Sequence, residues 1–480
     1  MTCSDCITSV AFVEHERYPV GRSTPRVPRL AASALAGVAA AELVAMAMHS
    51  TGPIDGAARF VVDTVPVPVV ETTVRMLGRF DKDATRLGVL ASVCVAGAAI
   101  DGRRSRPFAI VGLSTLGALL AVRRPPRRTS AVVLGALAGA TTALVSDRAP
   151  VPVPLATIGA AVALVVRKRR RAARAEYGPL PSLEDGAEKW GCTTPLITPT
   201  ASLYVTDVNL GPPQFNRDRH VLEIRGAVER PLNLHVDELR EIASVPFASV
   251  LVCIHNRVGG ERIGNVMWQG AELDRIIDLV KPTPEARFVS TVAVDGFRAT
   301  MPLATFGDDG LGGWVVFAMN GAELTPSHGG PVRFLVPGLY GQYNGAKWLS
   351  RLEFLQRHPG DYWTPRGWAH GPMPVRVGSR LDAPRVSGRT ATLTGVAWAP
   401  PHGIDTVHIL VNGQAVPAML ADEVDPRSWR RFRAEVELGP GRHRIQAQAT
   451  SALGVEQSDD RRPPFPTGAT GLHTIEVRIP

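Results

Sequence analysis

The sequence predicts three parts of different fold class: an N-terminal α-helical transmembrane bundle, a central α+β domain and a C-terminal all-β immunoglobulin-like sandwich. Apolar runs rich in Ala, Val, Leu and Gly, separated by arginines, fill the first third of the 480 residues. Short strands and helices follow without regular alternation, and after residue 374 apolar and polar residues alternate in short segments. The expected boundaries are 1–29 for a tail, 30–166 for the transmembrane region, 167–202 for a basic flank and linker, 203–373 for the α+β domain and 374–480 for the sandwich.

The first apolar run, Leu30–Met48, is long enough to cross a bilayer and lacks the cleavage pattern of a signal peptide. Soluble core helices do not come as a series of all-apolar rods with arginine-rich joints. Shorter apolar runs follow at 84–100, 108–122, 131–145 and 151–166. We therefore expect about five transmembrane helices, with about four as the alternative.

Glu42 interrupts the first run, where a charge is costly if it faces lipid. A polar packing contact is the simpler explanation, and a proton- or quinone-linked role is the alternative. Counting Lys and Arg in the short flanks gives 14 against 8 in favour of a multi-pass cell-membrane protein whose C-terminal part faces the cytoplasm. Arg103-Arg104 before an apolar run is a weak echo of an export signal and leaves the opposite orientation open.

The formal charge of +9 owes six positive charges to residues 167–174. Such a cluster beside apolar runs is typical of a flank attracted to anionic membrane lipid, so we do not expect a nucleic-acid partner. Cys3 and Cys6 have the spacing of a zinc or redox pair, but no second pair follows, and Ile7 stands where haem attachment needs His. No haem motif occurs in the chain.

Cys253 ends the apolar run that begins at Phe247 and precedes the polar turn of Asn256, Arg257 and two glycines. A strand that delivers a thiol to a loop suits a metal ligand, although a lone Cys more often behaves as a small hydrophobic residue. The residues that follow favour the metal. The segment from about Tyr204 to about Tyr362 resembles the molybdenum-binding domain of the sulfite oxidase family, through Trp268-Gln-Gly270, Asp295-Gly-Phe297, Met319-Asn-Gly321, His328-Gly-Gly-Pro-Val-Arg333, Pro337-Gly-Leu-Tyr-Gly341 and Lys347-Trp348 in order.

The resemblance implies an α+β sulfite oxidase-like domain that binds a molybdenum–molybdopterin cofactor, with Cys253 as the protein ligand of the metal. Soft sulfur suits this role, because a coordinating thiol is deprotonated outright. The pterin carries a phosphate, for which cationic donors are needed. The residues implied as pterin contacts are Asn256, His328, Arg333 and Lys347.

Catalytic roles are implied for two further residues, Arg257 to orient an anionic oxygen and Tyr362 to donate a hydrogen bond. One departure concerns the substrate: where the family commonly has an Arg, this chain has Val205 and Thr206. We expect oxygen-atom transfer on sulfite or an S-oxide, with electrons exchanged with a quinone or a redox protein. The alternative is a catalytically degenerate membrane scaffold that keeps the fold to bind partners.

The last part of the chain carries the signals of an antiparallel sandwich. Val407–Val411 alternates, Asn412-Gly413 is a strong hairpin signal, and residues 414–420 are expected to return beside it. Further alternating segments lie at 432–438, 445–449 and 475–479. In the family this tail often pairs two chains, so a homodimer is expected.

Overall fold

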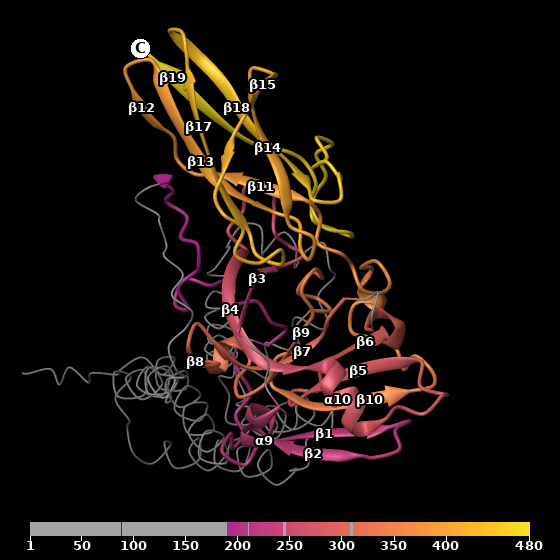
Figure 1. The fold of residues 1–480 in the computed structure, drawn as a ribbon. Coiled ribbons are helices and arrows are strands. Elements are labelled where there is room, and N and C mark those ends of the chain that lie inside the picture. The colour runs from indigo at the N-terminus through magenta and orange to yellow at the C-terminus, as the bar shows by residue number, and fades with distance from the viewer. Residues whose placement is uncertain (1–87, 89–189, 210, 243–245, 308–310, 345) are drawn as a thin grey trace, which may run out of the picture.

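The computed structural model describes residue 88 and residues 190–480, except 210, 243–245, 308–310 and 345. Among these residues, no helix is both long enough and apolar enough to cross a membrane. The predicted transmembrane helices, with Glu42, and the Cys3/Cys6 pair lie outside the described residues, apart from the single residue Gly88. Figure 1 shows the C-terminal sandwich at one end of the described part and the strands β1 and β2 at the other.

The sheet at the opposite end from the sandwich is mixed, with strand order β2-β1-β10-β5-β6, and only β1 and β10 run parallel. Its strands are β1 (Val221–Gly226), β2 (Leu232–His235), β5 (Phe288–Ala293), β6 (Arg298–Pro302) and β10 (Leu349–Leu355). One face alternates into a core built by Leu222, Ile224 and Phe354. The helices α9 (Val236–Glu241) and α10 (Leu273–Val280) add Leu239 and Ile276 to this core.

The middle sheet is antiparallel, with order β3-β4-β7-β8 and β9 paired to β7. Its strands are β3 (Phe247–Val252), β4 (Ile263–Glu272), β7 (Trp314–Met319), β8 (Ala322–Glu323) and β9 (Arg333–Leu335). All six residues of β3 and of β7 are buried. The expected strand before Cys253 is therefore confirmed, and it is covered on both faces.

The C-terminal part consists of two antiparallel sheets around one apolar core. One contains β11 (Gly378–Leu381), β12 (Arg385–Ser387), β13 (Thr390–Trp398), β16 (Met419–Leu420) and β17 (Arg430–Glu437). The other contains β14 (Ile404–Val411), β15 (Gln414–Pro417), β18 (Gly441–Ser451) and β19 (His473–Ile479). The Asn412-Gly413 hairpin is confirmed, but only residues 414–417 return beside β14, because the chain crosses at Ala418 and Met419 pairs with Arg433 in the other sheet.

Residues 192–203, which we call the strap, precede the α+β part in the chain. They contact both the middle sheet and the C-terminal part. The Leu196 carbonyl accepts hydrogen bonds from Trp429 Nε1 at 2.8 Å and from Asn265 Nδ2 at 2.9 Å. The buried Asp382 carboxylate accepts the Thr193 and Thr194 backbone N–H groups. Leu196 and Leu203 of the strap are buried in two of the apolar clusters.

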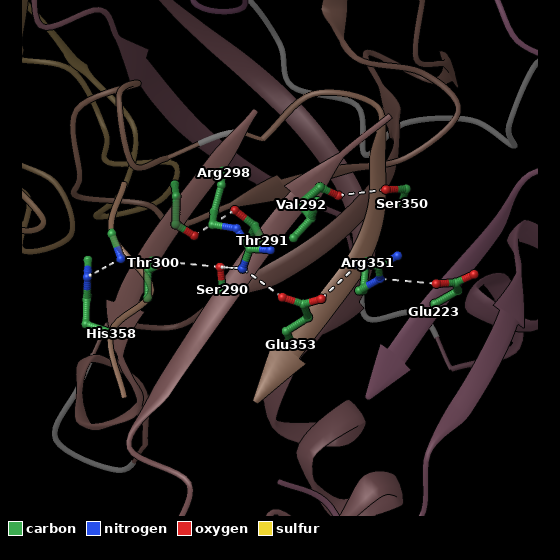
Figure 2. A network of polar contacts seen from close by, with 12 residues as sticks. Glu223, Ser290, Thr291, Val292, Arg298, Thr300, Ser350, Arg351, Glu353 and His358 are labelled. Atoms are coloured by element: carbon green, nitrogen blue, oxygen red, sulfur yellow. Dashed lines mark hydrogen bonds and ion pairs between the residues drawn. The ribbon is translucent and has the colours of Figure 1, made fainter. Parts of the chain in front are cut away.

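A polar network covers the outer face of the mixed sheet (Figure 2). Arg298 on β6 pairs with Glu353 on β10, which also pairs with Arg351, and Arg351 reaches Glu223 on β1. Ser290 on β5 lies beneath the Arg298 guanidinium and accepts its hydrogen bond at 2.8 Å. The network therefore connects β1, β10, β5 and β6 through side chains as well as through the backbone ladder.

Candidate active site

Hydrogen bonds among Cys253, Asn256 and Arg262 close the loop after β3. The Cys253 N–H donates to the Arg262 carbonyl at 3.0 Å, and the Asn256 N–H donates to the Cys253 carbonyl at 2.8 Å. Asn256 Oδ1 accepts the Arg262 N–H at 2.9 Å. A side chain on Gly260 would approach Asn256 Oδ1 to 2.7 Å, which explains a glycine at this tight turn.

The Cys253 thiol is 6% exposed and has an imidazole beside it. Its Sγ lies 3.8 Å from His255 Nδ1. Burial alone would raise the pKa of Cys253, but the hydrogen bond and charge of His255, with the charge of Arg262, outweigh burial and lower the pKa below its usual value. The fold therefore favours the thiolate, which is the form that binds metals.

Tyr204 is close enough to the Cys253 thiol and to two arginines for their charges to change its pKa. Burial raises its pKa well above the usual value, the Cys253 charge raises it further, and Arg333 and Arg262 oppose the rise. The Gly341 N–H donates to the Val252 carbonyl at 2.8 Å and brings the 336–344 loop against the same strand end. Three segments far apart in the sequence thus meet around the thiol.

Arg333 is the most deeply buried cation of this group, at 2% exposure. Burial lowers its pKa to about 10, so it stays charged at neutral pH. Its guanidinium lies 5.2 Å from the Trp268 ring centroid, and Nη1 donates to the His328 carbonyl at 3.2 Å. A buried guanidinium without a carboxylate in these contacts is a strong site for an anion.

His328 belongs to the short 3₁₀ helix η3 (Pro326–His328) and differs from the sequence expectation. Burial, followed by the charges of Lys347 and Arg333, lowers its pKa to about 3, so the imidazole is neutral rather than cationic. Its Nδ1 lies 2.7 Å from Thr325 Oγ1. With the Thr325 hydroxyl donating to Nδ1, the ring carries its proton on Nε2 and presents a donor there.

Lys347 packs against the η3 turn and is already paired in this structure. Its Nζ lies 3.2 Å from Asp207 Oδ2 and donates to the Ser327 carbonyl at 2.8 Å. The pair is nearly buried, with 11% and 7% of the side chains exposed. Asp207 thereby offsets one positive charge of the site.

These residues fit a molybdopterin cofactor. Among the described residues, His328 Nε2, Arg333 Nε and both amide atoms of Gln342 are buried without a hydrogen-bond partner. Unpartnered buried polar atoms are costly, and an oxygen- and nitrogen-rich ligand would satisfy them. The lowered pKa of the Cys253 thiol adds the soft donor that the metal requires.

Arg257 and Tyr362 lie apart from this cradle. Arg257 is exposed and lines a cavity of about 430 Å³ between the Cys253 loop and the sandwich, together with Asn256, Trp398 and His402. Tyr362 is buried under the Arg366 guanidinium, 3.6 Å from its ring centroid, and 5.0 Å from the Trp363 ring centroid. The structure thus brings Cys253, Asn256, His328, Arg333 and Lys347 together around one loop and its neighbours.

Sequence reasoning missed Tyr204, Arg262, His255 and Asp207 as members of the site. Arg262 is beside the thiol because β3 and β4 pair in a register that sets Val252 opposite Ile263. This hairpin could have been predicted from the sequence, which has an apolar run, a glycine-bearing turn and a second apolar run. No sequence pattern predicts that His255 and Asp207 belong to the site, because their contacts depend on the orientation of a single side chain.

Comparisons with known proteins agree with this geometry. Residues 209–363 match the family model described as "Oxidoreductase molybdopterin binding domain". The uncharacterized oxidoreductase YuiH of Bacillus subtilis is 31% identical over 149 residues, which are 31% of this chain and 71% of that protein. A nitrate reductase [NADPH] of Fusarium oxysporum is 29% identical over 161 residues, 29% of this chain and 18% of that enzyme.

The chain thus spans about a fifth of the length of such nitrate reductases. Among solved structures, the sulfane dehydrogenase SoxCD from Paracoccus pantotrophus superposes with a TM-score of 0.51 at 19% identity, over 59% of this chain and 81% of that chain, which shows a shared fold. The cradle around Cys253, the family match and the extent of the YuiH alignment lead to one conclusion. The chain belongs to the sulfite oxidase-like molybdopterin oxidoreductases.

Proposed function

We propose that this molybdopterin-dependent oxidoreductase is membrane-anchored and transfers an oxygen atom to or from sulfite or an S-oxide. The observation that carries the proposal is the Cys253 thiolate, favoured by its surroundings, beside the Arg333–His328–Lys347 cradle. A soft ligand for a metal and hydrogen-bond donors for a phosphate-bearing pterin lie within one buried site.

Each residue of the cradle has a distinct task in this proposal. Cys253 binds the metal, and Arg333 and Lys347 hold the pterin and its phosphate. His328 donates from Nε2 as a neutral imidazole, because burial between Lys347 and Arg333 keeps it uncharged. Asn256 holds the loop in shape by accepting the Arg262 N–H and would contact the pterin. When bound, the cofactor supplies the metal at which an oxygen atom and an electron pair are exchanged.

Arg257 orients the anionic oxygen of the substrate and Tyr362 donates a hydrogen bond to it. The Arg257 side chain lines the cavity beside the sandwich, so this role requires the substrate to approach through that cavity. The Arg257 side chain is basic and exposed to solvent, so it attracts an anion toward the cavity. Tyr362 is held in one orientation by Arg366, which donates to the Tyr362 carbonyl at 2.8 Å and covers the ring.

Nitrate is a second candidate substrate, because nitrate reductases are similar to this chain over the same domain. Nitrate and sulfite are both small oxyanions, and both need cations that exclude water around them. Val205 and Thr206 stand where the sulfite oxidase family commonly has an Arg, so Arg257 is the cation proposed for the substrate, and activity measurements decide between sulfite, an S-oxide and nitrate.

Electrons pass to a separate carrier in this proposal, a quinone or a redox protein, because the chain carries no haem motif. Residues 30–166 anchor the enzyme as a multi-pass protein of the cell membrane, with the basic residues 167–174 against anionic lipid and the catalytic domain on the cytoplasmic side. The C-terminal sandwich pairs two chains in a homodimer.

The deciding experiment measures molybdenum per chain and oxidoreductase activity for the wild type and Cys253→Ala, purified from a host that makes molybdopterin. We expect about one molybdenum per wild-type chain, turnover with sulfite, an S-oxide or nitrate, and loss of more than about 99% of turnover in the variant, since the metal loses its protein ligand. Cys192→Ala, which removes a buried thiol elsewhere, is the control and should retain turnover. Folded wild-type protein without metal or pterin would leave only the scaffold alternative.

A further inference from the structure

The imidazole of His255 lies beside the Cys253 thiol and has no task in the proposed function. It follows the thiol by two residues, and Nδ1 lies 3.8 Å from Sγ, within the longer hydrogen-bond distance of sulfur. A coordinating thiol has lost its proton and can only accept a hydrogen bond. With metal bound, therefore, any hydrogen bond between these two atoms has to be donated by an Nδ1–H.

We propose that His255 is a positioning residue that donates an Nδ1–H hydrogen bond to the metal-bound Cys253 thiolate and thereby raises the reduction potential of the centre. The proposal rests on the proposed binding of the metal by Cys253. A hydrogen bond withdraws electron density from sulfur, so the thiolate donates less to the metal and stabilises the oxidised state less. Hydrogen bonds to ligand sulfur set potentials in other metal centres in the same way.

The His255 ring is held in place by a cluster of aromatic rings from the α+β part and the C-terminal part of the chain. The Trp368 ring meets it edge-on, with centroids 4.8 Å apart and planes at 67°. Trp368 is 5% exposed and packs against Phe465 at 5.0 Å and Trp363 at 6.2 Å. Trp363 in turn donates from Nε1 to the Gln342 carbonyl at 2.8 Å, beside the loop that packs on β3.

This support gives the hydrogen bond a fixed direction. A half-buried imidazole that rotated freely would spend little time with Nδ1 facing sulfur, whereas an edge contact with a buried indole restricts the ring. Phe465 belongs to the C-terminal part of the chain, so the sandwich contributes to the thiolate's surroundings without touching it.

The test compares His255→Leu, which removes the donor at similar size, with His255→Gln, which keeps an N–H donor. The readout is the midpoint potential of the molybdenum couple, from a redox titration of the full-length enzyme followed by the electron paramagnetic resonance of the half-reduced metal. We expect His255→Leu to shift the oxidation equilibrium about tenfold toward the oxidised state, or ~59 mV lower for a one-electron step. His255→Gln should recover at least half of that shift.

A third variant, Trp368→Leu, leaves the donor in place and removes its support. It should lower the potential by less than His255→Leu and broaden the resonance, because the ring takes several orientations. If His255→Leu retains too little metal to titrate, the potentials of the two single variants Trp368→Leu and His255→Gln still test the proposal. Potentials equal to the wild type in every variant, or equal shifts in the Leu and Gln variants of His255, would refute the proposal.

The titration needs no substrate, so its outcome is independent of which oxyanion or S-oxide the enzyme uses. A metal-loaded wild type with unshifted variants refutes the role of His255 alone. A wild type that binds no molybdenum refutes it together with the proposed function.

Discussion

His328 is a buried base whose proton balance changes on folding. Burial between Lys347 and Arg333 lowers its pKa to about 3, against an ordinary value of 6.5. Between these two values the unfolded chain binds a proton that the folded chain does not bind, so the free energy of unfolding falls as the pH falls through this window. At pH 5 the loss amounts to about 2 kcal/mol for this residue.

We expect His328→Gln in the cofactor-free protein to reduce this pH dependence, since Gln does not titrate. The measurement is denaturant unfolding at pH 7.5 and pH 5, followed by tryptophan fluorescence; all eight tryptophans lie at or after Trp190, so the signal reports the described part. Folding also lowers the pKa of His220 and His473, so a smaller slope should remain. An unchanged slope in His328→Gln would show that the imidazole is not held neutral.

The residue scale is also where sequence reasoning was least complete. One site for Arg333, Lys347 and Cys253 was implied by the resemblance of their motifs to a known family, because composition and periodicity alone do not bring them together. The protonation state of His328 is not readable from a motif, since it depends on how far Lys347 and Arg333 lie from a buried ring. His255 was missed for the same reason, as its task arises from a 3.8 Å approach.

Strand β10 is the element on which the mixed sheet depends, because it pairs with β1 on one side and β5 on the other. Its Glu353 is 15% exposed and bonds both Arg298 and Arg351. Burial raises the pKa of Glu353, but these hydrogen bonds and charges outweigh it and lower the pKa. The carboxylate therefore stabilises the fold above its unfolded pKa and loses this effect as the pH falls through the folded value.

Glu353→Gln should lower the free energy of unfolding by about 1–2 kcal/mol at pH 7, because two guanidinium groups lose a charged acceptor. Glu435→Gln is the matched control: its ion pair with Arg433 is on a strand too, but 54% of the Glu435 side chain is exposed. Glu435→Gln should lower the free energy of unfolding by less than about 0.5 kcal/mol. Equal losses in the two variants, measured by urea unfolding, would contradict a special role for β10.

At the scale of elements, the strand before Cys253 and the Asn412-Gly413 hairpin could be predicted from the sequence, because alternation of apolar and polar residues and turn residues are local signals. Residues 414–420 were predicted to return as one strand, and the structure divides them between two sheets. That division depends on Met419 and Leu420 pairing with β17, which the sequence alone does not reveal.

On the scale of the whole molecule, the strap holds the α+β part and the sandwich together. The Asp382 carboxylate accepts two backbone N–H groups of the strap and the Thr194 hydroxyl. We expect Asp382→Ala to release the strap from the sandwich, so that limited proteolysis cleaves near residues 192–203 at least about tenfold faster, a rise that corresponds to ~1.4 kcal/mol of local stability.

Asp405→Ala, a change on the exposed side of β14, is the control for this experiment and should leave the cleavage rate unchanged. The release is also expected to lower molybdenum retention, because the strap leads directly into Tyr204 beside the thiol. Unaltered cleavage in Asp382→Ala would mean that Trp429 and Asn265 hold the strap without the carboxylate.

The contact between Trp368 and Phe465 has a consequence for how the enzyme is made. A ribosome synthesises Cys253 and the whole cradle before it reaches Phe465. The Trp368 ring that supports His255 thus receives this neighbour only after the cradle residues have been made. A chain released before Phe465 would carry a thiol whose surroundings are incomplete.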